Sequence, residues 1–444
     1  MKFFLFVVLL AMSIPAHSQV IQTFAGNGVS GFSGEGGPAI SAQFNRPAGV
    51  ATDRVGNIYI ASDINNIIQK IDTNGTLTRF AGSGLRGYSG DGGLATSARL
   101  SLNLHCAIAV DSIGNVYFSD SNVVRKVDAT GIISTVAGNG TRGYSGDGRA
   151  ATAAQFFLPA GICFDKTGNL FILDYSAKVL RKVNTVGIIS TIAGSGTSYV
   201  EGQPASSVAL GGGIGVATDD SGNIFITDAF PFNYSRIRKI NTSGIISTFG
   251  GGGIADSCDG CVATSLKLIS PWGLVVDHEG SLYVAAAGNQ FIHKITPSGL
   301  AYRIAGNGDF GYSGDGGPAR LAKLNSPLMI WLDNKGDLLF SDMGNSRFRK
   351  ITLSTTNTNS LQKTPISLKI FPNPHSGNNF TIKLTSPSNE EGVITISNLL
   401  GESFFVDKIS TNQIKDISLE LASGMYTITV QTATSSITSI LISD

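Results

Sequence analysis

Short apolar runs alternate with glycine-containing turns along most of this chain. In the first complete unit, runs rich in apolar or β-branched residues lie at positions 48–53, 58–62, 67–72 and 76–82. The pairs Gly56-Asn57 and Asn74-Gly75 separate neighbouring runs. Gly-Asn and Asn-Gly between β-branched runs are typical of hairpin turns. The unit is therefore predicted to form four antiparallel strands.

This unit recurs. The phrase Asp-x-x-Gly appears six times at intervals of 54 to 58 residues, beginning at Asp53, Asp111, Asp165, Asp219, Asp277 and Asp333. An apolar strand running into glycine also appears six times, but its first copy, residues 20–26, precedes Asp53 and no copy follows Asp333. A four-stranded repeat of fixed period predicts an all-β, six-bladed β-propeller. The offset predicts that strand 20–26 completes a last blade made of residues 328–333, 337–341 and 347–351.

The repeat resembles the NHL family over residues 20–352. The matching segments begin at Pro47 (Pro-Ala-Gly-Val-Ala-Thr-Asp), at Gly56 (Gly-Asn-Ile-Tyr-Ile-Ala-Ser-Asp) and at Gln69 (Gln-Lys-Ile-Asp). His105 and Gly213 replace the motif proline, and Ala286 replaces an aspartate. The resemblance implies a six-bladed binding scaffold. Related six-bladed lactonases and lyases hold a channel metal, but their His and carboxylate ligands have no match here. We therefore expect a non-catalytic scaffold with no catalytic residue and no cofactor, and the alternative is a propeller hydrolase or lyase with a metal in the central channel.

Composition and the N-terminus restrict location and partners. Glycine accounts for 55 of 444 residues, only 14% are charged, and the net charge is +1. A neutral chain gives no global attraction for nucleic acid, so no nucleic-acid partner is expected. Residues 1–18 resemble a secretory signal peptide, with Lys2, an apolar run at 3–12 and Ala16-His17-Ser18 at the cleavage site. The chain is expected to pass through the Sec route to the periplasm, with no transmembrane segment.

An acidic residue followed by glycine stands in the long connection before each blade. These loop acids are Glu35, Asp91, Asp147, Glu201, Asp259 and Asp315. Alanine follows four residues later in every copy, and small or apolar residues follow seven later, which predicts a short helix whose N-terminus the acid caps. The alternative is a calcium site.

Two further sets of charged residues recur. Asp63, Asp120, Asp174, Asp228 and Asp342 end second strands, where they are expected to bond the N–H groups of their own turns. Third strands carry the Arg-Lys pairs 125–126, 181–182, 238–239 and 349–350, expected to be solvated or to join blades.

The four cysteines fall into two classes. Cys106 and Cys163 lie in predicted inner strands, where a thiol behaves as a small hydrophobe. Cys258 and Cys261 lie in a glycine-rich loop, where a local disulfide is expected. A zinc site lacks a second ligand pair, and a redox motif lacks its βα context.

Function is expected where the copies differ. Blade four has the longest loop between its second and third strands, and this insertion carries Phe230, Phe232 and Tyr234. The insertion either binds a glycan or protein partner or folds over the blade edge. Trp272 and His105, at the start of inner strands, line the channel mouth or serve packing.

Residues 353–365 form a Ser/Thr/Asn-rich linker, and residues 366–444 contain about seven short β-rich runs, typical of a small immunoglobulin-like β-sandwich. This tail resembles the type A sorting domain of the Bacteroidota type IX secretion system. The motif residues are Phe371, Pro372, Asn373, Pro374, Gly401, Gly424 and Tyr426. The resemblance implies delivery by the type IX machinery, followed by secretion or retention at the cell surface. The domains expected are thus 1–18, 19–352, 353–365 and 366–444.

Overall fold

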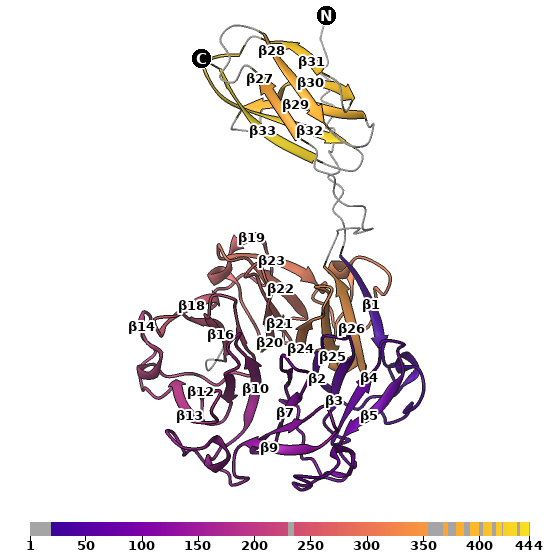
Figure 1. Cartoon of the computed structure of the whole chain (residues 1–444), viewed down its shortest axis with the longest axis vertical. Coiled ribbons are helices and arrows are strands. Elements are labelled where there is room, and N and C mark those ends of the chain that lie inside the picture. Colours follow the sequence, from indigo (N-terminus) through magenta and orange to yellow (C-terminus); the bar gives the residue numbers. More distant parts are fainter. Residues whose placement is uncertain are drawn as a thin grey trace, which may run out of the picture. The chain divides into compact units, whose positions relative to one another are not determined.

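The computed structural model describes residues 19–229, 235–353, 367–371, 379–385, 391–398, 403–410, 414–419, 421–432 and 436–443. The chain divides into two compact units between Thr355 and Thr356. Figure 1 shows the first unit as a ring of twisted sheets and the second as a separate β-domain. The described residues contain strands and short 3₁₀ turns but no α-helix, in agreement with the all-β prediction.

Six sheets form the ring, and each runs from an inner strand to an outer one. Blades one to three contain β2 (Pro47–Thr52), β3 (Ile58–Ser62), β4 (Ile67–Ile71), β5 (Leu77–Ala81); β6 (Ile108–Val110), β7 (Val116–Asp120), β8 (Val123–Val127), β9 (Ile133–Ala137); and β10 (Pro159–Phe164), β11 (Leu170–Asp174), β12 (Val179–Val183), β13 (Ile189–Ala193). Blades four and five contain β15 (Val216–Thr218), β16 (Ile224–Asp228), β17 (Arg236–Ile240), β18 (Ile245–Gly251) and β20 (Pro271–Val276), β21 (Leu282–Ala286), β22 (Phe291–Ile295), β23 (Leu300–Ala305). These two blades each gain a short outer strand, β14 (Gln203–Pro204) and β19 (Asp259–Val262). The six-bladed prediction is confirmed.

The N-terminal strand completes blade six. This blade contains β24 (Pro327–Leu332), β25 (Leu338–Asp342), β26 (Arg347–Thr352) and, outermost, β1 (Val20–Ala25). β1 pairs antiparallel with β26, Val20 opposite Thr352 and Ile21 opposite Ile351. Ile21 and Ile351 are both fully buried, so the closure includes core packing as well as hydrogen bonds. The predicted closure is confirmed.

The Asp-x-x-Gly phrase shapes the hairpin between the first and second strands of each blade. In blade one, Asp53 Oδ1 accepts hydrogen bonds from the N–H groups of Val55, Gly56 and Asn57, while Oδ2 accepts from Asn57 Nδ2 and the Tyr59 hydroxyl. Gly56 has φ 101°, where a side chain would be strained. Burial raises the pKa of Asp53, but these hydrogen bonds outweigh it and lower the pKa overall. One carboxylate thus fixes the whole turn.

Glycines in the inner strands let neighbouring blades approach closely around the axis. A Cβ atom on Gly161 would lie 2.1 Å from the carbonyl oxygen of Ile214, and one on Gly215 would lie 2.3 Å from that of Trp272. Gly49 and Gly273 meet the next inner strand in the same way. The glycine of the Pro-x-Gly motif is therefore required by strand-to-strand contact.

The second unit consists of two antiparallel sheets. One contains β27 (Ser367–Phe371), β28 (Asn379–Thr385) and β31 (Ile414–Ser418); the other contains β30 (Ser403–Ser410), β29 (Glu391–Asn398), β32 (Gly424–Thr432) and β33 (Ser436–Ser443). Alternate residues such as Ile394, Ile396, Ile428 and Val430 are buried in one core. This alternation is typical of a sandwich.

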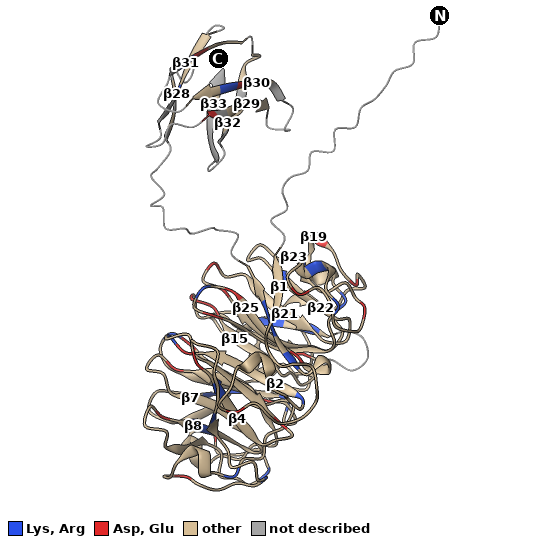
Figure 2. Cartoon of the chain, turned by 90° about the vertical axis from the view of Figure 1, so that its right-hand side faces the viewer, with Lys and Arg blue, Asp and Glu red and all other residues tan. Residues whose placement is uncertain are grey.

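Along the propeller ribbon, Lys and Arg positions are interspersed with Asp and Glu positions (Figure 2). Within the described parts of the chain, no helix combines the length and apolarity needed to cross a bilayer.

Candidate functional site

The loop acids do not cap helices, so that prediction was wrong. The segments that follow them are three-residue 3₁₀ turns, beginning at Ala39, Ala95, Ala151, Ala205, Ala263 and Ala319. None of these turns has a side-chain cap hydrogen bond or an acid in its first turn. The residue at each cap position is Pro, Leu, Ala or Val, which lacks a side-chain acceptor.

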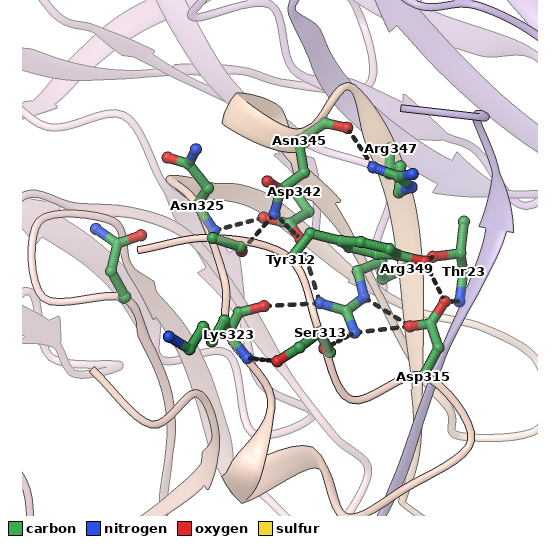
Figure 3. A network of polar contacts seen from close by, with 12 residues as sticks. Thr23, Tyr312, Ser313, Asp315, Lys323, Asn325, Asp342, Asn345, Arg347 and Arg349 are labelled. Carbon is green, nitrogen blue, oxygen red and sulfur yellow. Dashed lines mark hydrogen bonds and ion pairs between the residues drawn. The ribbon is translucent and has the colours of Figure 1, made fainter. Parts of the chain in front are cut away.

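The loop acids instead bind arginines, as blade six shows (Figure 3). The guanidinium of Arg349 lies 2.6 Å from Asp315 Oδ1 and 3.3 Å from Asp342 Oδ2, and it also donates to the carbonyl oxygens of Ser313 and Lys323. The side chain of Arg349 has no solvent exposure. Arg349 therefore ties the loop before the blade to the second and third strands.

The same acid holds the closing strand. Asp315 Oδ2 accepts a hydrogen bond of 3.0 Å from the backbone N–H of Thr23 in β1 and one of 2.7 Å from the Tyr312 hydroxyl. Burial raises the pKa of Asp315, but the bonds from Thr23 and Tyr312 and the charge of Arg349 outweigh it and lower the pKa. At Asp342 burial dominates, and the pKa rises to about 6. Both carboxylates are ionised at neutral pH and serve structure.

Three other blades repeat this arrangement. Arg125 pairs with Asp91 and Asp120, Arg181 pairs with Asp147, and Arg238 pairs with Glu201 and Asp228. All three arginine side chains are fully buried. The prediction that these arginines are solvated was therefore wrong, because each is buried and pairs with an acid in the connection between its own blade and the preceding one. The prediction that strand-end aspartates bond their own turns holds only in part. Asp174 accepts from Ala177 of its turn and also from two N–H groups of the preceding loop. Asp120, Asp228 and Asp342 bind an arginine and a preceding loop.

Blades one and five lack this arginine. Gln69 stands in its place in blade one, where Glu35 pairs with Arg79 at 3.0 Å. In blade five, His293 replaces the arginine and Ala286 replaces the strand-end aspartate. The loop acid Asp259 pairs with Arg320. His293 is fully buried, and neither ring nitrogen has a hydrogen-bond partner. Blade five thus contains an uncompensated buried imidazole.

The disulfide and one buried thiol agree with the sequence prediction, whereas the second free thiol is only partly buried. Cys258 and Cys261 form a disulfide at β19. Cys106 is a buried free thiol, whereas Cys163 is partly exposed and lines the axial cavity described below. Burial raises the pKa of both free thiols.

Three rings from different blades meet near the axis. The His105 ring lies 5.2 Å from the Trp272 ring with 12° between their planes, and 4.8 Å from the Tyr175 ring. His105 precedes β6 in blade two, Tyr175 follows β11 in blade three, and Trp272 lies in β20 of blade five. Blades two and five are opposite in a ring of six, so the stack crosses the axis. We call these three residues the aromatic cluster; all three are partly exposed.

A guanidinium lies beside this cluster. Burial lowers the pKa of His105, and the positive charge of Arg46 lowers it further. Arg46 pairs with Asp63 at 3.2 Å, and its side chain is 43% exposed. His105 is therefore neutral at pH 7, and the cluster combines aromatic faces with a partly exposed donor of hydrogen bonds.

A cavity of about 180 Å³ occupies the axis below the cluster. Its wall consists of residues from the six inner strands, and it includes no His, Asp or Glu. Among the described residues, no group of three or more His, Cys, Asp or Glu is arranged to hold a metal ion.

Sequence and structure comparisons identify both units. Residues 84–144 and 139–209 match the Teneurin NHL domain family, and residues 369–444 match the secretion system C-terminal sorting domain family. The ring is an NHL-type propeller, and the tail is a type IX sorting domain.

The NHL-type propeller has curated relatives among the teneurins. Teneurin-3 of Danio rerio is 31% identical over 231 residues, which is 46% of this chain and 8% of the relative. Teneurin-1 of Gallus gallus is 26% identical over 398 residues, which is 78% of this chain and 14% of the relative. The chain thus spans a small part of each. A solved auxiliary nutrient binding protein of Bacteroides thetaiotaomicron has 16% identity and a TM-score of 0.54, covering 75% of this chain and 76% of that one. This likeness shows the fold.

Not all predicted site residues fall within the described structure. Phe230, Phe232 and Tyr234 of the insertion lie outside the described residues, as do Pro372, Asn373, Pro374 and Gly401 of the sorting motif. Phe371 ends β27, Gly424 begins β32, and buried Tyr426 donates a hydrogen bond of 2.9 Å to the carbonyl oxygen of Ala422.

Sequence reasoning selected His105 and Trp272 but missed Tyr175 and Arg46. Tyr175 directly follows a strand-end aspartate, where other copies have Ile64, Ser121 and Ala229. The aromatic residue at this position in blade three is the sequence feature that could have identified Tyr175 as a candidate site residue.

Proposed function

We propose that the propeller is a non-catalytic binding scaffold for a glycan or protein, docked at the aromatic cluster. The observation that carries this proposal is the convergence of three partly exposed rings with the guanidinium of Arg46 at one end of the axis. Aromatic faces and directed hydrogen-bond donors are the groups that bind sugar rings, so the cluster favours a glycan over a protein. The nutrient-binding description of the Bacteroides neighbour agrees with this role.

The remaining polar residues support a scaffold rather than an enzyme. The loop acids are engaged with arginines, and the cavity wall offers a metal neither imidazole nor carboxylate. The alternative is a hydrolase or lyase with a metal in the central channel. Stoichiometric, tightly bound zinc or calcium in the purified protein would favour that alternative.

The sorting domain supplies the route of delivery. We propose that the chain reaches the periplasm through the Sec route and that the type IX machinery then secretes it or retains it at the cell surface. The match of residues 369–444 supports this assignment.

The experiment is a glycan and surface-protein screen with the full mature chain. Trp272→Ala and Tyr175→Ala are each expected to weaken a glycan hit by roughly tenfold, because each removes one stacking face. Tyr144→Ala is the matched control, since Tyr144 is exposed on the outer rim, where it bonds Thr191. Unchanged affinity in both cluster variants contradicts the proposal.

A triple variant tests the blade-four insertion separately. Replacing Phe230, Phe232 and Tyr234 with Ala should weaken the same hit if the insertion takes part in binding. Unchanged affinity would show that the insertion does not take part in binding, and the proposal for the aromatic cluster would still stand.

A further inference from the structure

The axial cavity is open at one end of the inner strands. Its deep wall includes Val50, Ile162 and Met329, with exposed fractions of 2%, 4% and 6%. The lining residues at the C-terminal ends of inner strands, among them Phe164 and Thr218, are partly exposed. Exposure thus increases toward the ends of the strands, so the mouth of the cavity lies there.

The aromatic cluster lies at the other end of the axis. His105 and Trp272 come from opposite blades at the starts of the inner strands, and their stacked rings lie across the axis. Neither residue belongs to the cavity wall. The cluster and the cavity therefore have separate linings on the same axis.

The polar side chains at the mouth are already satisfied. Trp331 Nε1 donates a hydrogen bond of 3.0 Å to Thr52 Oγ1, and Thr218 Oγ1 donates one of 3.0 Å to the carbonyl oxygen of Phe164. No Lys, Arg, His, Asp or Glu lines the cavity. A charged ligand would lose its hydration without gaining a charged partner, whereas an apolar ligand gains from leaving water.

The size of the cavity limits the ligand. A dry, apolar protein cavity of roughly 150 Å³ binds benzene. At about 180 Å³, this cavity is larger by about one small substituent. We propose that the axial cavity is a second binding site, which takes a neutral, apolar small molecule of the size of one substituted benzene ring. This site lies at the opposite end of the axis from the proposed glycan site and does not depend on it.

Intrinsic fluorescence provides a direct test with toluene as the probe. The chain has two tryptophans, Trp272 in the cluster and Trp331 in the cavity wall. In the full mature chain carrying Trp272→Phe, Trp331 is the sole reporter. Titration with toluene should give a saturable change in its emission, while benzoate, a charged molecule of similar size, should give none.

A pair of variants at Thr218 locates the binding. Thr218→Trp fills the mouth and should raise the apparent Kd for toluene at least roughly tenfold, because an indole then occupies the ligand's space. Thr218→Val keeps the volume and should leave the Kd within about twofold. Toluene should also raise the Tm of the Thr218→Val protein but not that of the Thr218→Trp protein.

Three results would overturn the proposal: no saturable change with toluene, equal binding of benzoate, or unchanged toluene binding in a folded Thr218→Trp protein. If Thr218→Trp fails to fold, Phe164→Trp, at the same mouth, replaces it. Loss of glycan binding in these variants would test the proposed glycan site at the aromatic cluster and would not test the axial cavity.

Discussion

Acidification should destabilise the propeller through one residue of blade five. His293 is fully buried without a hydrogen-bond partner. Burial lowers its pKa from 6.5 to about 4, and the charge of Arg303 adds to this effect, while Asp259 acts in the opposite direction. Between these two pH values, the unfolded chain binds a proton that the folded chain does not. Stability is therefore unaffected above pH 6.5 and falls as the pH decreases toward 4.

The magnitude follows from the two pKa values. Each pH unit in this window costs about 1.4 kcal/mol, so the free energy of unfolding should fall by about 3 kcal/mol from pH 6.5 to pH 4. Asp120 and Asp342, whose pKa values rise to about 6, change stability in the opposite direction. The quantity to measure is therefore the difference between the wild type and a variant without the imidazole.

His293→Gln is that variant, because blade one already has a buried glutamine, Gln69, at this position. Urea unfolding from pH 7.5 to 4, followed by tryptophan fluorescence, reports on the propeller alone, since both tryptophans lie in it. The wild type should lose about 3 kcal/mol more than His293→Gln over this range. His278→Gln is the control, because His278 is exposed at the surface. Equal pH dependence in the wild type and His293→Gln would refute the reasoning.

Two further outcomes follow from the propeller and the tail. Arg349→Met should lower the free energy of unfolding, measured in urea, by about 3–5 kcal/mol, because Asp342 is left buried without its charged partner. Lys323→Met breaks an exposed pair and should lower it by less than about 1 kcal/mol. Similar losses in both variants would contradict the role assigned to Arg349. A chain truncated before Ile366 should accumulate in the periplasm while the full chain reaches the surface or the medium, as followed by cell fractionation and immunoblotting. Normal export of the truncated chain would argue against sorting through the tail.

The repeat predicted the fold because its determinants are local. Asp53 binds the turn that directly follows it, and Gly49 and its counterparts recur at a fixed place in each inner strand. The position of residues 20–26 ahead of the first full repeat was sufficient to predict the closure by β1.

The site was harder to predict because its contacts join distant positions. Arg125 and Asp91 are separated by 34 residues, and their pairing depends on how a loop folds back over its blade. The alanine spacing after the loop acids predicts helices with acidic caps, whereas the segments are only three residues long. The stack of His105 on Trp272 depends on which blades face each other across the ring. A local sequence pattern does not contain this information.

The pairing of β1 with β26 has a consequence for synthesis. A chain made from its N-terminus produces β1 first, but the partner of β1, β26, is the last strand of the ring to appear. Until then β1 presents an unpaired edge, and Thr23 lacks the carboxylate of Asp315. A product that stops before Arg347 therefore retains an open edge, whereas a complete one conceals it. An exposed strand edge is therefore a property of incomplete chains, which can associate with other chains through that edge until the ring closes.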